Sequence, residues 1–253
     1  MSLKEFNNVC ELVSEISAET YSIFVYDKGC KSTIAEKNIK KRIVPASLVK
    51  LLTFYMVFKL NLPLRRIVKI ERKFLKKGSG NNLLENDILT INDLLKNMIF
   101  NSSNTSAEAL RFLIEDAIEN KFQDYVLKLL KELDMHNTTI LNAHGLYDLG
   151  QYTIVPDFEK LMMKILDDVS MRSFLLYKHK NIILKRRGVN IEIETKRNDS
   201  FFLKTGTLYP NVFNSVQVVK MNNLYLIACL GFCKSQNSRL IDQEIVNIIA
   251  GDI

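Results

Sequence analysis

The sequence predicts an α+β fold, in which one antiparallel sheet built from the two ends of the chain has flanking terminal helices and an inserted all-helical domain. Three observations support this class. Residues 21–26 and the segment beyond residue 188 are rich in β-branched and aromatic residues. The sequence between them has mostly helical periodicity, and so do the first and last segments of the chain. We expect a discontinuous sheet domain formed by residues 1–46 and 186–253, and a helical domain formed by residues 47–185.

The N-terminal part of the sheet is expected to follow an amphipathic helix over residues 5–18, where apolar side chains recur at helical spacing. Residues 21–26 are rich in β formers, and the Asp-Lys-Gly sequence at residues 27–29 is a turn signal. Residues 32–36 can then return as the second arm of a hairpin. An antiparallel sheet is therefore expected to begin here.

A buried helix is expected over residues 47–60, because this run is dense in apolar residues. Pro45 disfavours helix at Val44, so the helix should begin at Ser47. Ser47 would then lie where free backbone N–H groups and the positive end of the helix dipole gather.

The chain from this helix to about residue 180 is expected to be almost entirely helical, with a polar, Gly-containing interruption at residues 76–82. Capping-box patterns at residues 90–93 and 105–108 predict two helix starts, which makes residues 101–104 a tight polar link. Further helices are expected at residues 121–133 and from Pro156 onward.

The segment after residue 188 changes to a period of two. Strands are expected at residues 189–195, 201–204, 214–219 and 224–231. Asn222-Asn223 suits the hairpin turn between the last two strands, and a closing helix is expected over residues 237–249.

The composition is that of an ordinary globular protein, with 253 residues, 47% hydrophobic and 25% charged. The longest apolar stretch near the C-terminus, residues 224–233, is about half of what a membrane-spanning helix needs, so no transmembrane segment is expected. The N-terminus lacks the basic and apolar regions of a secretory signal. Cys10, Cys30, Cys229 and Cys233 have no C-x-x-C spacing, so we expect free thiols, no metal site and no cofactor.

The formal charge of +7 is spread along the chain, with one denser basic run at residues 185–187. A nucleic-acid interface would require a continuous basic patch with stacking aromatic residues, and the sequence does not contain one. A solvated basic face is the better interpretation, and it favours anionic substrates or polymers.

Three short motifs carry chemistry: Ser47-x-x-Lys50, Ser102-x-Asn104 and Lys204-Thr205-Gly206. The first and third occur once each, whereas S-x-N also matches at residues 79–81 and 235–237. Residues three apart share a helix face, so a hydroxyl and an amine at these positions would point into the same space. An amine whose pKa is lowered by burial or by another cation can accept the proton of a serine nucleophile.

In the order and placement of these motifs the chain resembles the penicillin-recognising serine hydrolases, which include class A β-lactamases and D-alanyl-D-alanine carboxypeptidases. Separations of 55 residues from Ser47 to Ser102, and of 102 residues from Ser102 to Lys204, fit the family, whereas Ser79 lies too close to Ser47. The similarity covers nearly the whole chain. It implies a β-lactamase/transpeptidase-like fold, with the active site between the sheet and the helical domain.

The resemblance implies four catalytic residues. Ser47 would be acylated and Lys50 would take its proton, while Ser102 would pass a proton to the departing nitrogen. Lys204 would keep Lys50 and Ser102 poised electrostatically. The backbone N–H groups of Ser47 and Thr207 would form the oxyanion hole.

The resemblance also implies substrate-binding residues. Asn104 would hold the substrate amide, and Thr205, Gly206 and Thr207 would form the carboxylate site together with the preceding lysine. Asn142 belongs to a loop that resembles the corresponding loop of low-molecular-mass D,D-carboxypeptidases. We therefore expect Asn142 to bind substrate. His144 in the same loop is expected to be structural, because the family needs no histidine base.

Three hypotheses remain open at this point. Class A β-lactamases use a loop glutamate to activate the deacylating water, but no acidic residue lies between Asp134 and Asp148, and the aligned position is near Thr138. Ser103, where β-lactamases usually have Asp, also favours a carboxypeptidase. The end at Ile253 is expected to leave no room for the additional C-terminal domain that many carboxypeptidases carry, and this counts against that interpretation. The leading hypothesis is a D,D-peptidase-like enzyme that β-lactams acylate and that deacylates them slowly. The alternatives are a class A-like β-lactamase and a non-catalytic penicillin-binding-like sensor.

The resemblance implies a small-molecule or peptidoglycan-peptide substrate, binding of β-lactams, and an extracytoplasmic location.

Overall fold

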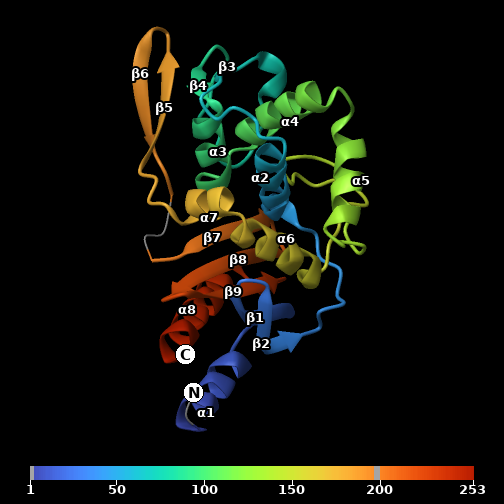
Figure 1. Ribbon diagram of the computed structural model, residues 1–253, viewed down its shortest axis with the longest axis vertical. Coiled ribbons are helices and arrows are strands. Elements are labelled where there is room, and N and C mark those ends of the chain that lie inside the picture. Colours follow the sequence, from blue (N-terminus) through green and yellow to red (C-terminus); the bar gives the residue numbers. More distant parts are fainter. Residues whose placement is uncertain (1–2, 197–199) are drawn as a thin grey trace.

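A computed structural model describes residues 3–196 and 200–253 of the chain, with side chains from residue 7 onward. It contains a five-stranded antiparallel sheet in the order β2-β1-β9-β8-β7, formed by the two ends of the chain (Figure 1). The predicted α+β class is confirmed. The strands are β1 (Thr20–Asp27), β2 (Cys30–Lys37), β7 (Phe202–Leu208), β8 (Val212–Met221) and β9 (Leu224–Gly231).

The terminal helices α1 (Leu3–Ser14) and α8 (Gln236–Asp252) pack together on one face of this sheet, and the helical part covers the other face (Figure 1). The period of two explains how the sheet serves two cores. Ile23 lies opposite Ala228 in the cluster under α8, whereas Phe24 lies opposite Ile227 in the larger cluster beneath the helices. Each strand thus holds the two layers together.

The helical part is arranged around α2 (Val49–Lys59), whose residues 49–57 are all buried. A helix that is apolar on every side is stable only when other helices enclose it. Lys50 and Thr53 are its buried polar residues, and both make hydrogen bonds to a neighbouring loop. The surrounding helices are α3 (Ile91–Phe100), α4 (Asn104–Ile118), α5 (Phe122–Glu132), α6 (Val155–Asp167) and α7 (Val169–Leu176).

A second, four-stranded sheet was not predicted. Its order is β3-β4-β5-β6, and it lies beside the helical part (Figure 1). A strand was expected at residues 189–195 and is present, but it pairs with β5 instead of joining the sheet of the termini, so that part of the prediction is wrong. The strands are β3 (Ile67–Lys69), β4 (Ile88–Thr90), β5 (Asn181–Arg186) and β6 (Val189–Glu194).

Two contacts explain why this hairpin stays with the helices. Ile182 and Leu184 alternate with exposed residues along β5 and join the core of the helical part. Arg186 forms an ion pair with the buried Asp87, at 2.7 Å. The division of the chain into domains at residues 46/47 and 185/186 stays a prediction.

Of the two predicted helix caps, the one at Thr90 is correct and the one at Thr105 is wrong. Thr90 caps α3, because its hydroxyl accepts a hydrogen bond from Asp93 N at 3.1 Å. The cap of α4 is Ser103 and not Thr105, since the Ser103 hydroxyl accepts from Ser106 N at 3.2 Å. Thr105 lies in the first turn of α4, and its hydroxyl accepts a hydrogen bond from Lys76 N, in the segment before β4.

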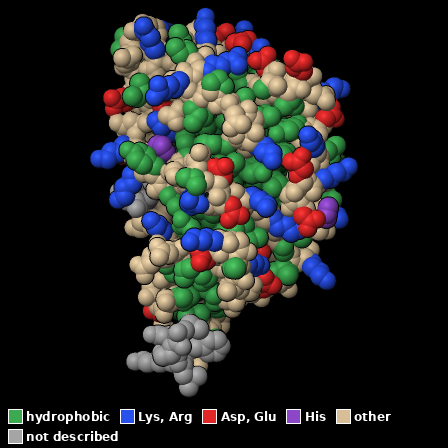
Figure 2. Space-filling view, in the orientation of Figure 1, with side chains coloured by type: hydrophobic (Ala, Val, Ile, Leu, Met, Phe, Trp, Pro, Cys, Tyr) green, Lys and Arg blue, Asp and Glu red, His purple; other side chains and the backbone are tan. Residues whose placement is uncertain are grey.

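Within the described residues, no helix is long and apolar enough to span a membrane. On the face shown in Figure 2, lysine and arginine side chains alternate with acidic and polar ones and do not gather into one stripe.

Candidate active site

The Ser47 turn lies directly against strand β7. Ser47 belongs to a short 3-10 turn, Ala46–Leu48, that leads into α2. A Cβ atom at Gly206 would lie 2.7 Å from the carbonyl oxygen of Pro45, which is closer than real Cβ atoms approach. Glycine at this position therefore allows the Lys204-Thr205-Gly206 segment to lie beside the turn. This segment lies within β7 and not at its end, which corrects the predicted strand boundary.

Lys50 is completely buried, and its amine contacts three oxygen atoms. Lys50 Nζ lies 2.8 Å from Ser47 Oγ, 2.8 Å from Asn104 Oδ1 and 2.6 Å from the backbone oxygen of His144. The other end of the Asn104 amide donates to the carbonyl of Lys77 at 2.9 Å. The predicted spacing of Ser47 and Lys50 thus places their functional atoms in contact, and Asn104 joins them from α4.

Ser102 and Lys204 form a second pair. Lys204 Nζ donates to Ser102 Oγ at 2.9 Å and to the carbonyl of Thr205 at 3.2 Å, and Lys204 is 2% exposed. Ser102 has a left-handed backbone with φ of 57°, in the link between α3 and α4. That conformation is uncommon for a residue with a side chain, and it is typical of functional sites.

The two buried lysines have lowered pKa values. Burial, followed by the charge of Lys204, holds the pKa of Lys50 well below its ordinary value. Burial, followed by the charge of Arg239, lowers the pKa of Lys204 to about 7. The shift favours the neutral form of the Lys50 amine, and near neutral pH Lys204 lies close to its titration midpoint.

A cavity of about 740 Å³ opens along β7 and reaches α8. Ser102, Lys204, Thr205 and Thr207 line it, together with Arg239. Arg239 is 6% exposed, and its Nη1 donates to Thr207 Oγ1 at 2.8 Å. Among the described lining residues the charged side chains are cations, so the cavity suits an anionic ligand.

Arg239 was missed in the sequence. It belongs to no motif, and it is a single arginine in the first turns of a helix whose other features predict packing. Only the fold shows that α8 passes the end of β7.

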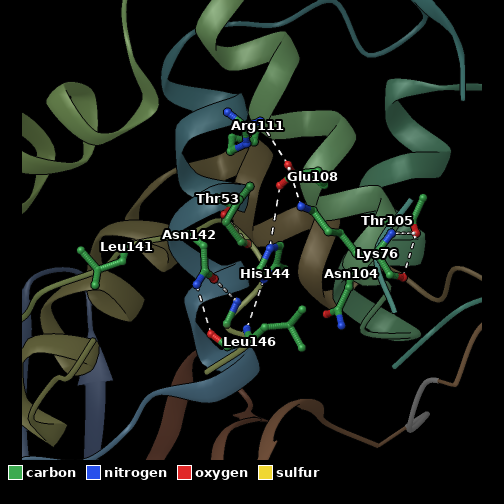
Figure 3. A network of polar contacts seen from close by, with 12 residues as sticks. Thr53, Lys76, Asn104, Thr105, Glu108, Arg111, Leu141, Asn142, His144 and Leu146 are labelled. Carbon is green, nitrogen blue, oxygen red and sulfur yellow. Dashed lines mark hydrogen bonds and ion pairs between the residues drawn. The ribbon is translucent and has the colours of Figure 1, made fainter. Parts of the chain in front are cut away.

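The loop around residue 144 packs on the Ser47 turn. A Cβ atom at Gly145 would lie 1.9 Å from the carbonyl oxygen of Ala46, so only glycine permits this contact. Asn142 Oδ1 accepts from Gly145 N at 2.7 Å, and Asn142 Nδ2 donates to the carbonyl of Leu146 at 3.1 Å (Figure 3). The Asn142 amide thus shapes the loop, and its contact with substrate stays a prediction.

Thr138 occupies the position that was aligned with the β-lactamase glutamate. It is 8% exposed, and its hydroxyl donates to Asp157 Oδ2 at 2.7 Å. The same hydroxyl lies 2.7 Å from that of Thr153. Its hydrogen-bonding atom is therefore used inside the protein.

A family model described as D-alanyl-D-alanine carboxypeptidase matches residues 7–229. The curated relative "D-alanyl-D-alanine carboxypeptidase DacF" from Bacillus subtilis (strain 168) is 25% identical over 166 residues, which are 64% of this chain and 42% of the relative. "D-alanyl-D-alanine carboxypeptidase DacC" from Escherichia coli (strain K12) is 24% identical over 243 residues, which are 90% of this chain and 60% of the relative. The chain thus spans less than two thirds of either relative.

Solved structures share the fold. The Streptomyces K15 DD-transpeptidase superimposes with a TM-score of 0.80 at 18% identity, over 94% of this chain and 98% of the other. Penicillin binding protein 5 from Haemophilus influenzae gives a TM-score of 0.74 at 21% identity, over 92% and 70% of the respective chains.

Proposed function

The chain belongs to the D-alanyl-D-alanine carboxypeptidase family, and on this basis we propose that it is an acyl-serine D,D-peptidase that β-lactams acylate at Ser47. The proposed substrate is a cell-wall peptide ending in D-Ala-D-Ala, and with it we propose a location outside the cytoplasm. The observation that carries the proposal is the environment of the Lys50 amine.

The three contacts of Lys50 Nζ assign its lone pair. The Asn104 amide oxygen and the His144 backbone oxygen can only accept hydrogen bonds, so they take the two N–H groups of a neutral amine. The third direction, toward Ser47 Oγ at 2.8 Å, is left for the lone pair. Lys50 is therefore poised to accept the hydroxyl proton when Ser47 Oγ attacks a carbonyl carbon.

The steps that follow use the second pair. Attack by Ser47 gives a tetrahedral intermediate, whose oxyanion would be held by the backbone N–H groups of Ser47 and Thr207. Collapse breaks the C–N bond, and the proton that Lys50 took from Ser47 would pass through Ser102 to the departing nitrogen, which leaves Lys50 neutral and Ser102 protonated again. Lys204, which donates to Ser102, supplies positive charge at this point.

The substrate carboxylate belongs at the far end of β7. Thr205 and Thr207 present hydroxyls to the cavity, and Arg239 donates to Thr207. A guanidinium and two hydroxyls beside Lys204 form a strong carboxylate site. The free C-terminus of a D-Ala-D-Ala peptide and the carboxylate of a penicillin would both bind there.

Slow deacylation of β-lactams is supported by the surroundings of Thr138. A deacylating base would have to direct a carboxylate at the acyl-enzyme, whereas this position holds a hydroxyl that is donated to Asp157. The β-lactamase alternative would require a deacylating base from outside this loop.

Intact-mass spectrometry during incubation with benzylpenicillin tests the proposal. We expect one covalent adduct that forms in the wild type, persists for many minutes, and is absent from Ser47→Ala. An adduct that disappears rapidly with turnover of the antibiotic would favour the β-lactamase alternative. A folded wild type without any adduct would favour the non-catalytic sensor.

Release of D-alanine from a peptide ending in D-Ala-D-Ala tests the natural activity. The peptidase proposal requires release by the wild type and none by Ser47→Ala.

A further inference from the structure

Two backbone carbonyls orient the side chains that act on Ser47. The carbonyl of His144 accepts from Lys50 Nζ at 2.6 Å, and the carbonyl of Lys77 accepts from Asn104 Nδ2 at 2.9 Å. Both carbonyls lie in segments outside helices and strands. Such segments need side-chain contacts to fix their backbone, because no ladder of hydrogen bonds does so.

A single buried carboxylate, Glu108 of α4, contacts both segments (Figure 3). Glu108 Oε1 lies 3.4 Å from Lys76 Nζ, and Lys76 directly precedes Lys77, whose carbonyl binds Asn104. Glu108 Oε2 lies 3.9 Å from His144 Nε2, in the residue whose carbonyl binds Lys50. Glu108 stands one helical turn after Asn104, so it reaches both segments from behind the site.

The protonation of His144 directs its ring to Glu108. His144 Nδ1 accepts from Leu146 N at 3.2 Å, which places the proton of the neutral ring on Nε2, the atom that faces the carboxylate. Burial lowers the pKa of His144 to about 4, so the ring stays neutral near pH 7. At 3.9 Å the contact is a polar approach, longer than a hydrogen bond, that turns the N–H side of the ring toward the carboxylate.

Arg111 and Thr105 take part in the same contacts. Arg111 donates to Glu108 Oε1 at 3.1 Å and pairs with Glu115 at 2.7 Å, on the more exposed side of the same helix. The Thr105 hydroxyl accepts from Lys76 N at 3.1 Å, so it also holds the segment that carries the Lys77 carbonyl. Glu108 contacts both this segment and the His144 segment.

We infer that Glu108 is a positioning residue for acyl transfer, which holds the His144 and Lys77 carbonyls where they orient Lys50 and Asn104. The inference rests on the proposed function of Ser47. Near-attack geometry is sensitive to small displacements, so loosening these carbonyls should slow the chemical step more than it weakens substrate binding.

The test measures acylation by a fluorescent penicillin over a range of concentrations, which separates the limiting rate constant from the apparent binding constant. Glu108→Gln should lower the limiting rate about tenfold and change the binding constant less than about twofold. Glu108→Ala, which also loses the acceptor atom, should lower the rate further. Glu115→Gln is the matched control, because it removes a carboxylate from the same arginine and helix, and it should acylate like the wild type.

If the ion cluster around Glu108 only stabilises the fold, the Glu108 variants should lose stability and keep the wild-type rate of acylation. Folded Glu108→Gln and Glu108→Ala with a wild-type limiting rate, even with reduced thermal stability, would overturn the inference. If these variants fail to fold, Lys76→Met tests it, because Lys76 lies at the partly exposed end of the cluster, with 35% of its side chain accessible. A slower limiting rate in Lys76→Met supports the inference, and a wild-type rate overturns it. An unlabelled wild type would overturn the proposed function as well.

Discussion

Lys50 and Lys204 are both buried amines, but each has a different neighbouring cation: Lys204 acts on Lys50, and Arg239 acts on Lys204. Burial, followed by the charge of Arg239, lowers the pKa of Lys204 to about 7, and burial, followed by the charge of Lys204, lowers the pKa of Lys50. Burial is the largest cause for both lysines. The two amines thus share burial as a cause of lowered pKa and differ in the cation beside them, which suits them to different roles.

The largest expected effect comes from replacing the base with a permanent cation. In Lys50→Arg the guanidinium stays protonated, so Ser47 has no acceptor for its proton, and acylation by fluorescent penicillin should fall about a thousandfold. Lys204→Arg is the comparison, because the charge at that position is useful, and it should retain far more activity. Similar losses in the two variants would contradict different roles for the lysines.

Removing the second amine should have an intermediate effect. Lys204→Met takes away the charge next to Ser102 and the carboxylate site, and the kcat/KM for a D-Ala-D-Ala peptide should fall about a hundredfold. In the wild type, Lys204 loses its proton as the pH rises through about 7, so KM should increase above that pH. Lys204→Arg should lack this alkaline change, and its persistence in that variant would assign the titration to another group.

Arg239→Met should cost about tenfold in kcat/KM, because one charge-assisted hydrogen bond to Thr207 is lost. Removing this cation should also raise the pKa of Lys204, which moves the alkaline limb of the pH profile to higher pH. An unchanged limb, measured with the same peptide, would show that Arg239 does not act on Lys204.

The last prediction concerns stability and its change with pH. The pKa of Lys204 is about 7 in the folded protein and 10.5 in the unfolded chain, so the unfolded state binds more protons between these values. Folding is therefore penalised below about pH 7, and the penalty is relieved as the pH rises toward 10.5. The free energy of unfolding should gain up to about 1.4 kcal/mol per pH unit from this group. Urea titrations of wild type and Lys204→Met should differ by that slope, and parallel curves would contradict it.

The sequence was most informative where function depends on local spacing. Ser47 and Lys50 are three residues apart on one helix face, and the structure places their polar atoms in contact. The pairing of Ser102 with Lys204, 102 residues apart, followed only from the resemblance to a family, because no local pattern fixes such a distance. The five-stranded sheet was predictable because its strands are seven to ten residues long, and β1 consists mostly of β-branched and aromatic residues.

The missed features are those without local signals. Strands β3 and β4 have three residues each, too few for a period of two to be recognised, and in β5 the exposed Ile183 between two buried apolar residues hides the alternation, so the second sheet was not predicted. Glu108 fitted a capping box that began at Thr105, but Ser103 is the cap, and Glu108 instead enters a buried ion cluster. Arg239 reaches the site only because α8 passes β7.

Two of the acceptors that orient the catalytic side chains belong to the main chain, at His144 and Lys77. Every amino acid carries a carbonyl, so no point substitution at these two positions can delete the acceptor. A deletion or insertion in either loop would displace it at once. The site should therefore tolerate a change in the identity of residue 77 better than a change in the length of its loop, and an insertion scan would locate functional segments that an alanine scan passes over.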